Sequence, residues 1–369
     1  MKDHPAAKLV ARALQFVETE NWQEAIARWR SLTDLEPDTG THWFNLGYSL
    51  VKTNAFAEAS DAYAEAVRLK PDSVIAWNNW GCSLGDWARV LPKDERPEKF
   101  NEAMQKFAEA VRLKPDFAEV WHSWGVFLSD WALELPKTKR PEKFNEAIQK
   151  FAEAVRLKPD FASAWFDWGC TLARWALSLP KAKRSAKLNE AEQKFAEAVR
   201  LQPDDQTAWK QWGDILSTWA RALPEAKRPA KFNKSVQKFA EAVRLKPDFA
   251  EAWDSWGGAL IGWACVLPEA ERQAKFDKAR EVLQSAETCR AGAGAYNLAC
   301  LSSLNGQPDE AKKWLVAARL HGNNVTSDCE HLRTDSDLDN LRGLVWFDTF
   351  VDEACRSADR IGGIIAYSG

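Results

Sequence analysis

The 369-residue sequence lacks the features that mark membrane, secreted and nucleic-acid-binding proteins. No run approaches about 18 consecutive apolar residues, so we expect no membrane-spanning helix. Residues 1–10 carry charges but no apolar core, and we therefore expect no signal peptide. Basic and acidic side chains number 50 and 53, so no overall charge favours nucleic acid or an anionic membrane.

Patterns of paired cysteines are also absent. The seven cysteines are odd in number and none are spaced as C-x-x-C, which argues against a disulfide framework and a zinc module. We predict reduced thiols in a cytoplasmic protein, with no metal and no cofactor. The cysteines are Cys82, Cys170, Cys265, Cys289, Cys300, Cys329 and Cys355.

Catalytic signatures are missing as well. The sequence contains no G-x-x-x-x-G-K-[ST], G-x-G-x-x-G or G-x-S-x-G motif. Cys82, His122, Cys170 and Asp214 are possible metal ligands, but helices that pack about 8–10 Å apart cannot bring them all to within about 2.0–2.3 Å of one ion. A nucleophilic pair of Cys82 and His122 lacks a third group to orient the histidine. We therefore predict that the protein is not an enzyme.

Tryptophan is the abundant residue, with 20 copies against four tyrosines, and it belongs to an internal repeat. A W-x-x-W-G-x-x-L-x-x-W-A pattern starts at Trp77, Trp121, Trp165, Trp209 and Trp253. Between these segments the run FAEAVRLKPD recurs with little change. Pro-Asp pairs recur first after 34 residues and then every 44, at Pro37, Pro71, Pro115, Pro159, Pro203 and Pro247.

Each repeat unit predicts a helix hairpin. Tryptophan and leucine from Trp77 to Leu91 are three and four residues apart, which is the apolar stripe of one helix. Pro92 ends that helix and Pro97 suits the start of a second one. We expect Leu91 and Phe100 to close the hairpin end over Trp87, and Asp116 to cap the next helix. Such hairpins must stack on one another to bury their apolar faces.

These residues resemble the tetratricopeptide repeat. Residues 41–72 carry its aromatic, Leu-Gly, Ala, aromatic, Ala and Pro positions, and residues before them fit through Ala25, Trp29 and Pro37. The longer units keep the same order but hold ten extra residues between the glycine and the first alanine. The matching residues of 41–72 are Trp43, Leu46, Gly47, Ala59, Tyr63, Ala66 and Pro71.

The resemblance implies an all-α, right-handed superhelical solenoid of antiparallel helix pairs. We predict two ordinary repeats in residues 1–73, five enlarged 44-residue repeats in 74–293, and a terminal helix pair with a capping helix, starting at Asp335, in 294–369. We expect the extra residues to lengthen the first helix of each enlarged unit by about 7–10 Å. The added length deepens a binding groove, thickens the core, or does both.

The two faces of the first helices behave differently between units. Fifteen tryptophans keep identical spacing, and we interpret them as core. The other face varies, whereas exposed second-helix positions such as Lys106, Lys150, Lys194 and Lys238 do not. In the tetratricopeptide family this varied face lines a concave peptide-binding groove. The predicted groove residues, called here the first-helix face, are Asn78, Cys82, Asp86, His122, Val126, Asp130, Phe166, Cys170, Arg174, Lys210, Asp214 and Asp254.

The function we predict is a protein-interaction scaffold that binds a peptide or protein segment in this groove. A self-assembling structural solenoid, which would form homo-oligomers, is the alternative from another class. Binding of RNA is more remote, because only residues 206–249 are clearly basic, with nine Lys and Arg against four Asp and Glu. We expect no small-molecule substrate. A clamp for a C-terminal carboxylate lacks its lysine pair beside Asn45, Asn78 and Asn79.

Overall fold

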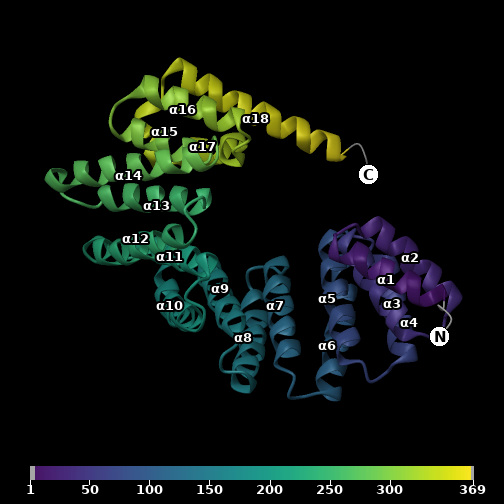
Figure 1. Cartoon of the computed structure of the whole chain (residues 1–369). Helices are drawn as coiled ribbons and strands as arrows, with labels where there is room; N and C mark the ends of the chain where they lie inside the picture. The colour runs from purple at the N-terminus through teal and green to yellow at the C-terminus, as the bar shows by residue number, and fades with distance from the viewer. Residues whose placement is uncertain (1–4, 367–369) are drawn as a thin grey trace. The chain divides into compact units, whose positions relative to one another are not determined.

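Helices form all the regular secondary structure of residues 5–366, which are the residues that this computed structural model describes, with side chains described for residues 6–356. No strand occurs in that range, and successive helices pack as hairpins (Figure 1). The predicted all-α helix-pair solenoid is therefore confirmed. The chain divides into two compact units after Ser178, within the third predicted enlarged repeat, and each unit is described separately.

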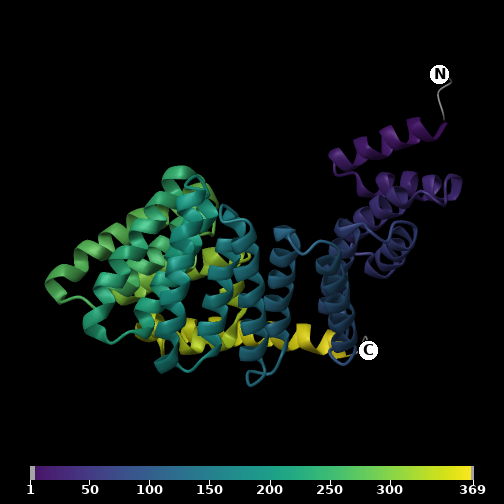
Figure 2. The ribbon, with the colours of Figure 1, turned by 90° about the horizontal axis from the view of Figure 1, so that it is seen from below.

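The first unit begins with short helices and continues with longer ones. Its first four helices have 13 or 14 residues, and the next five have 17 or 18. They are α1 Pro5–Glu18, α2 Trp22–Leu35, α3 Gly40–Lys52, α4 Phe56–Leu69, α5 Val74–Val90, α6 Arg96–Leu113, α7 Ala118–Glu134, α8 Arg140–Leu157 and α9 Ala162–Ser178. Figure 2 shows α5 to α8 running alongside one another.

The second unit holds the remaining long hairpins and a shorter C-terminal group. The long helices are α10 Arg184–Leu201, α11 Gln206–Ala222, α12 Arg228–Leu245, α13 Ala250–Ala264 and α14 Glu269–Cys289. The C-terminal group is α15 Ala295–Leu304, α16 Pro308–Leu320, α17 Cys329–Thr334 and α18 Val345–Ala366. Short 3-10 turns lie at Lys181–Lys183, Glu225–Lys227, Asn324–Ser327 and Ser336–Leu341.

Two local expectations at the ends of helices are wrong. The residue after the Pro-Asp pair precedes α7, so Phe117 and not Asp116 occupies the cap position, and its side chain makes no capping hydrogen bond. The closing helix does not start at Asp335, because residues 336–341 form a 3-10 turn and α18 begins at Val345 after Gly343, whose φ is +79°. A glycine adopts this left-handed backbone without the steric cost of a side chain.

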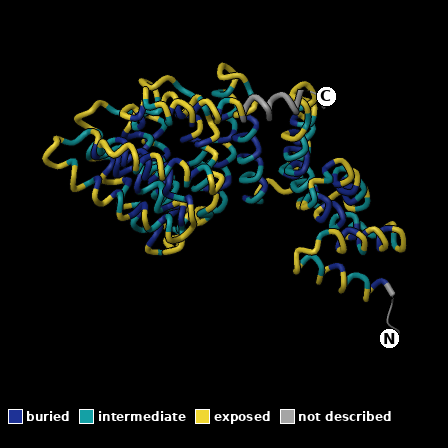
Figure 3. The backbone as a smooth tube through the Cα atoms, turned by 90° about the horizontal axis from the view of Figure 1, so that it is seen from above, coloured by how far each residue is buried: buried dark blue, intermediate teal, exposed yellow. Residues whose placement is uncertain are grey.

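The core lies between the two helices of each hairpin and between neighbouring hairpins. Phe107, Phe144 and Phe151 are fully buried. A side chain at Gly125 would place its Cβ 2.9 Å from the Phe151 ring, so only glycine lets α7 approach α8 this closely. Figure 3 shows the buried segments where helices face one another and the exposed segments mainly at turns.

Tryptophan also fastens each Pro-Asp turn to the helix that follows it. The first tryptophan of each unit donates its indole N–H to the carbonyl oxygen of the proline six residues earlier, as Trp121 does to Pro115 at 2.8 Å. The donors Trp43, Trp77, Trp165, Trp209 and Trp253 repeat this bond to Pro37, Pro71, Pro159, Pro203 and Pro247. The regular spacing of these two residues therefore has a direct structural cause.

The hairpin ends differ from the expected arrangement. Phe100 stacks on Trp131 of the next repeat, with ring centroids 5.1 Å apart, and Trp87 packs against the same apolar cluster. Trp87 is covered by Lys99, whose Nζ lies 4.6 Å from the ring centroid. The first helix grows from 13 residues in α3 to 17 in α5. This adds about 6 Å, which is less than predicted.

The prediction that all cysteines are reduced thiols is wrong for one pair. Cys329 at the start of α17 forms a disulfide with Cys355 of α18. The C-terminal helices bring these residues together although 26 positions separate them in the sequence, so no local spacing reveals the pair. The cysteine argument for a reducing compartment therefore no longer holds. Separately, none of the described helices is long and apolar enough to cross a membrane.

Candidate functional site

The tryptophan stripe packs inside the repeats, as predicted. All fifteen triad tryptophans are buried or half-buried, and Trp124 and Trp131 are each 8% exposed. The first two of each triad stack on one another, with ring centroids 5.9 Å apart for Trp121 and Trp124. These rings therefore serve as core and leave the opposite side of each first helix to be considered as a binding surface.

The invariant second-helix lysines have a structural explanation that the sequence did not reveal. Lys106, Lys150 and Lys238 each lie over a stacked tryptophan pair, with Nζ 3.8 or 3.9 Å from the nearer ring. Burial lowers the pKa of these amines, and of Lys194. The interpretation of these positions as ordinary exposed surface is wrong, because a cation held over aromatic faces is constrained by packing.

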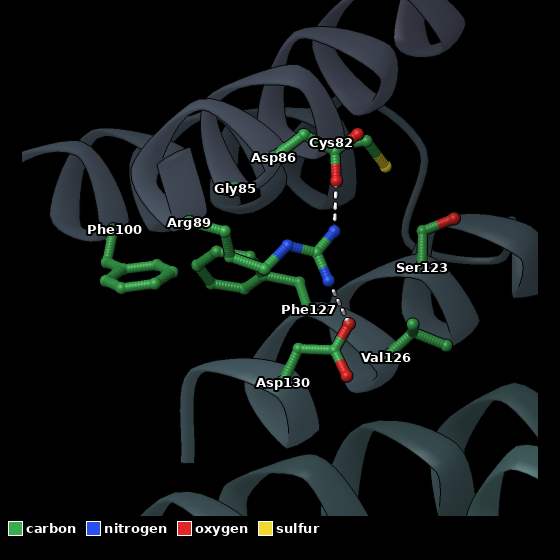
Figure 4. Close-up of a pocket in the computed structure, with 9 residues that line it drawn as sticks. All are labelled: Cys82, Gly85, Asp86, Arg89, Phe100, Ser123, Val126, Phe127 and Asp130. Carbon is green, nitrogen blue, oxygen red and sulfur yellow. Dashed lines mark hydrogen bonds and ion pairs between the residues drawn. The ribbon is translucent and has the colours of Figure 1, made fainter. Parts of the chain in front are cut away.

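A pocket opens on the first-helix face between α5 and α7 (Figure 4). Its volume is about 360 Å³ including its open mouth, and it combines aromatic rings with charged groups. Four of the predicted groove residues line it. The complete lining is Cys82, Gly85, Asp86, Arg89, Phe100, Ser123, Val126, Phe127 and Asp130.

The shape of this pocket depends on a glycine and an arginine. A Cβ at Gly85 would lie 2.8 Å from Phe127 Cδ2, so the missing side chain lets the Phe127 ring reach α5. The Arg89 guanidinium pairs with Asp86 on its own helix and donates to Asp130 Oδ2 of α7 at 2.8 Å (Figure 4). The charged side of the pocket is thus held in place across two repeats.

Polar contacts continue from α7 to α9. Arg174 donates to Asp130 Oδ1 at 2.8 Å, so Asp130 joins arginines from both neighbouring first helices. His122 Nε2 lies 2.7 Å from Asp167 Oδ2. The structure therefore brings Asp86, Asp130 and Arg174 together in one network, and it connects His122 to a residue outside the predicted set.

In the second unit the predicted residues pair locally. Lys210 Nζ lies 2.8 Å from Asp214 Oδ2, one turn along α11. Asn297 of α15 donates to Asp254 Oδ1 of α13 at 2.7 Å. Burial raises the pKa of Asp254 to about 6, although the bond from Asn297 and the charge of Lys210 act against that rise.

The cysteines of the first-helix face are poorly suited to nucleophilic chemistry. Burial raises the pKa of the Cys82 and Cys170 thiols to about 12, which keeps them protonated near neutral pH. His122 does have an orienting carboxylate in Asp167, contrary to expectation, yet no hydrogen bond links His122 with Cys82 in the described structure. Within residues 6–356, no three or more His, Cys, Asp or Glu residues gather as a possible metal site.

Other predicted residues lie outside the pocket between α5 and α7. Asn78 donates to Asn79 on the same helix at 3.2 Å, and Phe166 is half-buried on α9. Comparison of the repeats placed Arg89 in a varied row of the first helix, seven residues after Cys82, but did not include it among the predicted groove residues. It also omitted Phe127, because the packing of a ring against Gly85 of another helix leaves no local signal.

Comparison with known proteins assigns the first part of the chain to a family. The tetratricopeptide repeat profile matches residues 10–74. Residues 10–74 are tetratricopeptide repeats. The longer units that follow keep the helix-pair fold of tetratricopeptide-repeat proteins in 44-residue form. A search of curated proteins finds no significant match.

Three solved structures of tetratricopeptide repeat proteins are similar to parts of the chain to different degrees. The C-terminal part of a repeat-containing protein from Cytophaga hutchinsonii has a TM-score of 0.50 at 13% identity, covering 76% of this chain and 95% of its own. A tetratricopeptide repeat protein from Parabacteroides merdae gives 0.46 at 12%, covering 89% and 97%. YrrB, described as having an unusual peptide-binding site, gives 0.37 at 21%, covering 55% and 89%.

Proposed function

We propose that this tetratricopeptide-repeat chain is a protein-interaction scaffold that binds a peptide segment on the first-helix face, anchored between α5 and α7. The observation that carries the proposal is the pocket there, to which two successive repeats contribute predicted groove residues. Cys82 and Asp86 come from α5, and Val126 and Asp130 come from α7. An extended or helical partner that crosses neighbouring repeats would contact both helices.

The chemistry of the pocket suits one small apolar anchor with polar neighbours. Phe100, Phe127 and Val126 provide apolar surface, and the Arg89 network provides donors and acceptors at one side. Binding pockets in proteins commonly combine apolar walls with a few fixed polar groups. The proposal includes no catalytic step, and the protonated Cys82 thiol contributes surface to the wall.

A single substitution tests this assignment. Peptides selected from a displayed random library on the wild-type protein would be measured by fluorescence anisotropy against Val126→Arg, whose long side chain fills the pocket. We expect affinity to fall about tenfold or more, as for loss of an interface anchor. The matched control is Val316→Arg, the same replacement at an exposed valine of α16.

Two outcomes would contradict the proposal. Equal affinity of wild type and Val126→Arg for every selected peptide would show that the peptides bind elsewhere. Concentration-dependent oligomers in light scattering that Val126→Arg disrupts would show that the pocket is a self-assembly contact instead.

A further inference from the structure

The residue that follows the Pro-Asp pair of a repeat lies at the junction with the neighbouring repeat, and it differs in size from one repeat to the next. This position is phenylalanine in three units and a smaller residue in the others. The phenylalanines are Phe117, Phe161 and Phe249, and the smaller residues are Thr39, Ser73 and Asp205. The described contacts of Phe161 show what the aromatic ring does there.

Phe161 occupies an apolar slot, and a lysine side chain lies over its ring. Its ring centroid lies 4.9 Å from that of His122 on the preceding first helix, and it packs beside Ala154 and Ala164. The Nζ of Lys158 lies 4.7 Å from the Phe161 centroid. The same Nζ is 3.0 Å from the Glu119 carboxylate, so this lysine has both an aromatic and an acidic partner.

At Ser73 the corresponding slot is open. A pocket of about 440 Å³, including its mouth, lies between α3, the end of α4 and the start of α5. Its lining contains the counterparts of the residues around Phe161, position for position: Phe44 for His122, Ala66 for Ala154, Lys70 for Lys158 and Ala76 for Ala164. The complete lining is Gly40, Thr41, Phe44, Ala66, Lys70, Ser73, Ile75 and Ala76.

Lys70 lacks both partners that Lys158 has. Thr41 stands where the first helix of the later repeat carries Glu119, and Ser73 stands where it meets Phe161. Lys70 is exposed and forms no ion pair with the described residues. Ile75, at the rim of the pocket, is 53% exposed. The slot therefore combines apolar lining residues with a lysine that has no ion-pair partner among the described residues.

We propose that the Ser73 slot binds an aromatic side chain of a partner peptide, with a carboxylate next to that ring pairing with Lys70. The ring would take the place that Phe161 occupies in its own repeat, and the ammonium group would lie over its face. The first helices α3 and α5 both contribute residues to the slot, so this inference rests on the proposed function and extends it to a second anchor point. The partner segment is thus acidic and aromatic.

The chain itself supplies a probe. The acetylated hexapeptide Pro-Asp-Phe-Ala-Ser-Ala copies residues 159–164, and 4-fluorophenylalanine in place of its phenylalanine allows fluorine NMR titration. We expect saturable binding to the wild-type protein. Replacing the ring by alanine should weaken binding about tenfold or more, as for a buried aromatic anchor.

Two variants test the slot from the protein side. Ser73→Phe fills it with the residue found in sibling repeats, and the backbone permits this because φ and ψ are −76° and 87° at Ser73 and −90° and 93° at Phe117. We expect Ser73→Phe to weaken probe binding about tenfold and the open-slot control Ser73→Ala to leave it unchanged. Circular dichroism establishes that both remain helical.

If Ser73→Phe fails to fold, a change of charge at Lys70 still tests the inference. Lys70→Glu should weaken binding of the acidic probe severalfold. Lys70→Glu should have little effect on the binding of a probe whose aspartate is replaced by asparagine, because that probe has no carboxylate to pair with Lys70. Equal binding of the probe to wild type, Ser73→Phe and Lys70→Glu would overturn the inference. The inference would also be overturned if the wild-type protein formed a dimer that Ser73→Phe converts to monomers and that the probe does not affect. A second copy of the chain would then occupy the slot.

The results separate this inference from the proposed function. Val126 lies in the pocket between α5 and α7 and does not line the Ser73 slot. If Val126→Arg abolishes peptide binding and Ser73→Phe does not, the scaffold proposal stands and the second anchor is wrong. If the probe binds at Ser73 and Val126→Arg changes nothing, the slot stands and the anchor between α5 and α7 is wrong.

Discussion

The short hairpin α3–α4 and the long hairpin α7–α8 share one repeat pattern and differ in the turn added at one end. In the short hairpin Thr53 follows the last turn of α3, whereas the long hairpin continues the helix with Trp131 at the equivalent position. Trp131 is 8% exposed, stacks on Phe100 and lies under Lys143. The added turn therefore enlarges the core and binds neighbouring repeats together.

The two hairpins also differ at one lysine position and in how far the gap between neighbouring repeats is filled. Lys150 covers a tryptophan pair in α7–α8, where α4 has the buried Ala62 at the equivalent position. Conversely, the slot filled by Phe161 between long repeats is open at Ser73. The comparison shows that Phe161 fills, between two long repeats, a gap that stays open next to the short repeat at Ser73.

The largest expected effect concerns the added turn. Trp131→Ala should lower the free energy of unfolding by about 3–5 kcal/mol, because it empties a buried site and unstacks Phe100. Thr53→Ala, at the matching position of the short hairpin, should cost less than about 1 kcal/mol. Urea unfolding followed by circular dichroism measures both. Similar losses in the two variants would mean that the added turn has no special part in the core.

A smaller effect is expected from the acidic residue that replaces an apolar one on the first helix. Asp254 stands where the short repeat has Phe44, and burial raises its pKa from 3.8 to about 6. A raised folded-state pKa contributes stability that is fully present below pH 3.8 and is lost as the pH rises through about 6. Asp254→Asn should therefore be more stable than wild type at pH 7.5, by on the order of 2–3 kcal/mol, because its amide can still pair with Asn297.

The pH dependence provides the check on Asp254. The advantage of Asp254→Asn should shrink toward zero as the pH falls below 4, and Asp116→Asn provides the exposed control. Thermal unfolding from pH 3.5 to 7.5 would measure both variants. An advantage that is constant with pH would point to packing and not to the buried charge.

The smallest effect concerns the lysine that covers tryptophan. Lys150→Met keeps the length of the side chain and removes the cation, so it should cost about 0.5–2 kcal/mol. Lys137→Met, in the exposed turn before α8, should be within about 0.5 kcal/mol of wild type. Unfolding midpoints in urea compare the two. If Lys150→Met left the free energy of unfolding unchanged, contact with the tryptophan pair would not explain why this lysine is the same in the repeats.

Much of the helical pattern could be predicted from the sequence, whereas the partners of individual side chains could not. The first long helix was expected to carry its apolar stripe to Leu91 and to end at Pro92, and α5 ends at Val90, because proline and apolar spacing are local signals. The stacking of Phe100 on Trp131 and the Cys329–Cys355 disulfide join segments far apart in the sequence. Such pairs depend on how repeats pack, which periodicity does not specify.

The candidate site shows the same division. The varied positions of the first helices were found by comparing repeats, and four of them line the pocket between α5 and α7. The invariance of Lys106 and Lys150 was taken as a contrast with the varied face because both were expected to be exposed, whereas both lie over tryptophan rings. The comparison of repeats also did not single out Ser73, which lines an open slot at the position where Phe161 stands in a later repeat.

By itself the sequence determined that the chain folds as repeated helix pairs with tryptophan inside, because helical spacing and proline positions act over a few residues. Only the tertiary structure decided which gaps between pairs are filled and which are open. That outcome depends on the volumes of side chains from three helices at once, and no single stretch of sequence contains them.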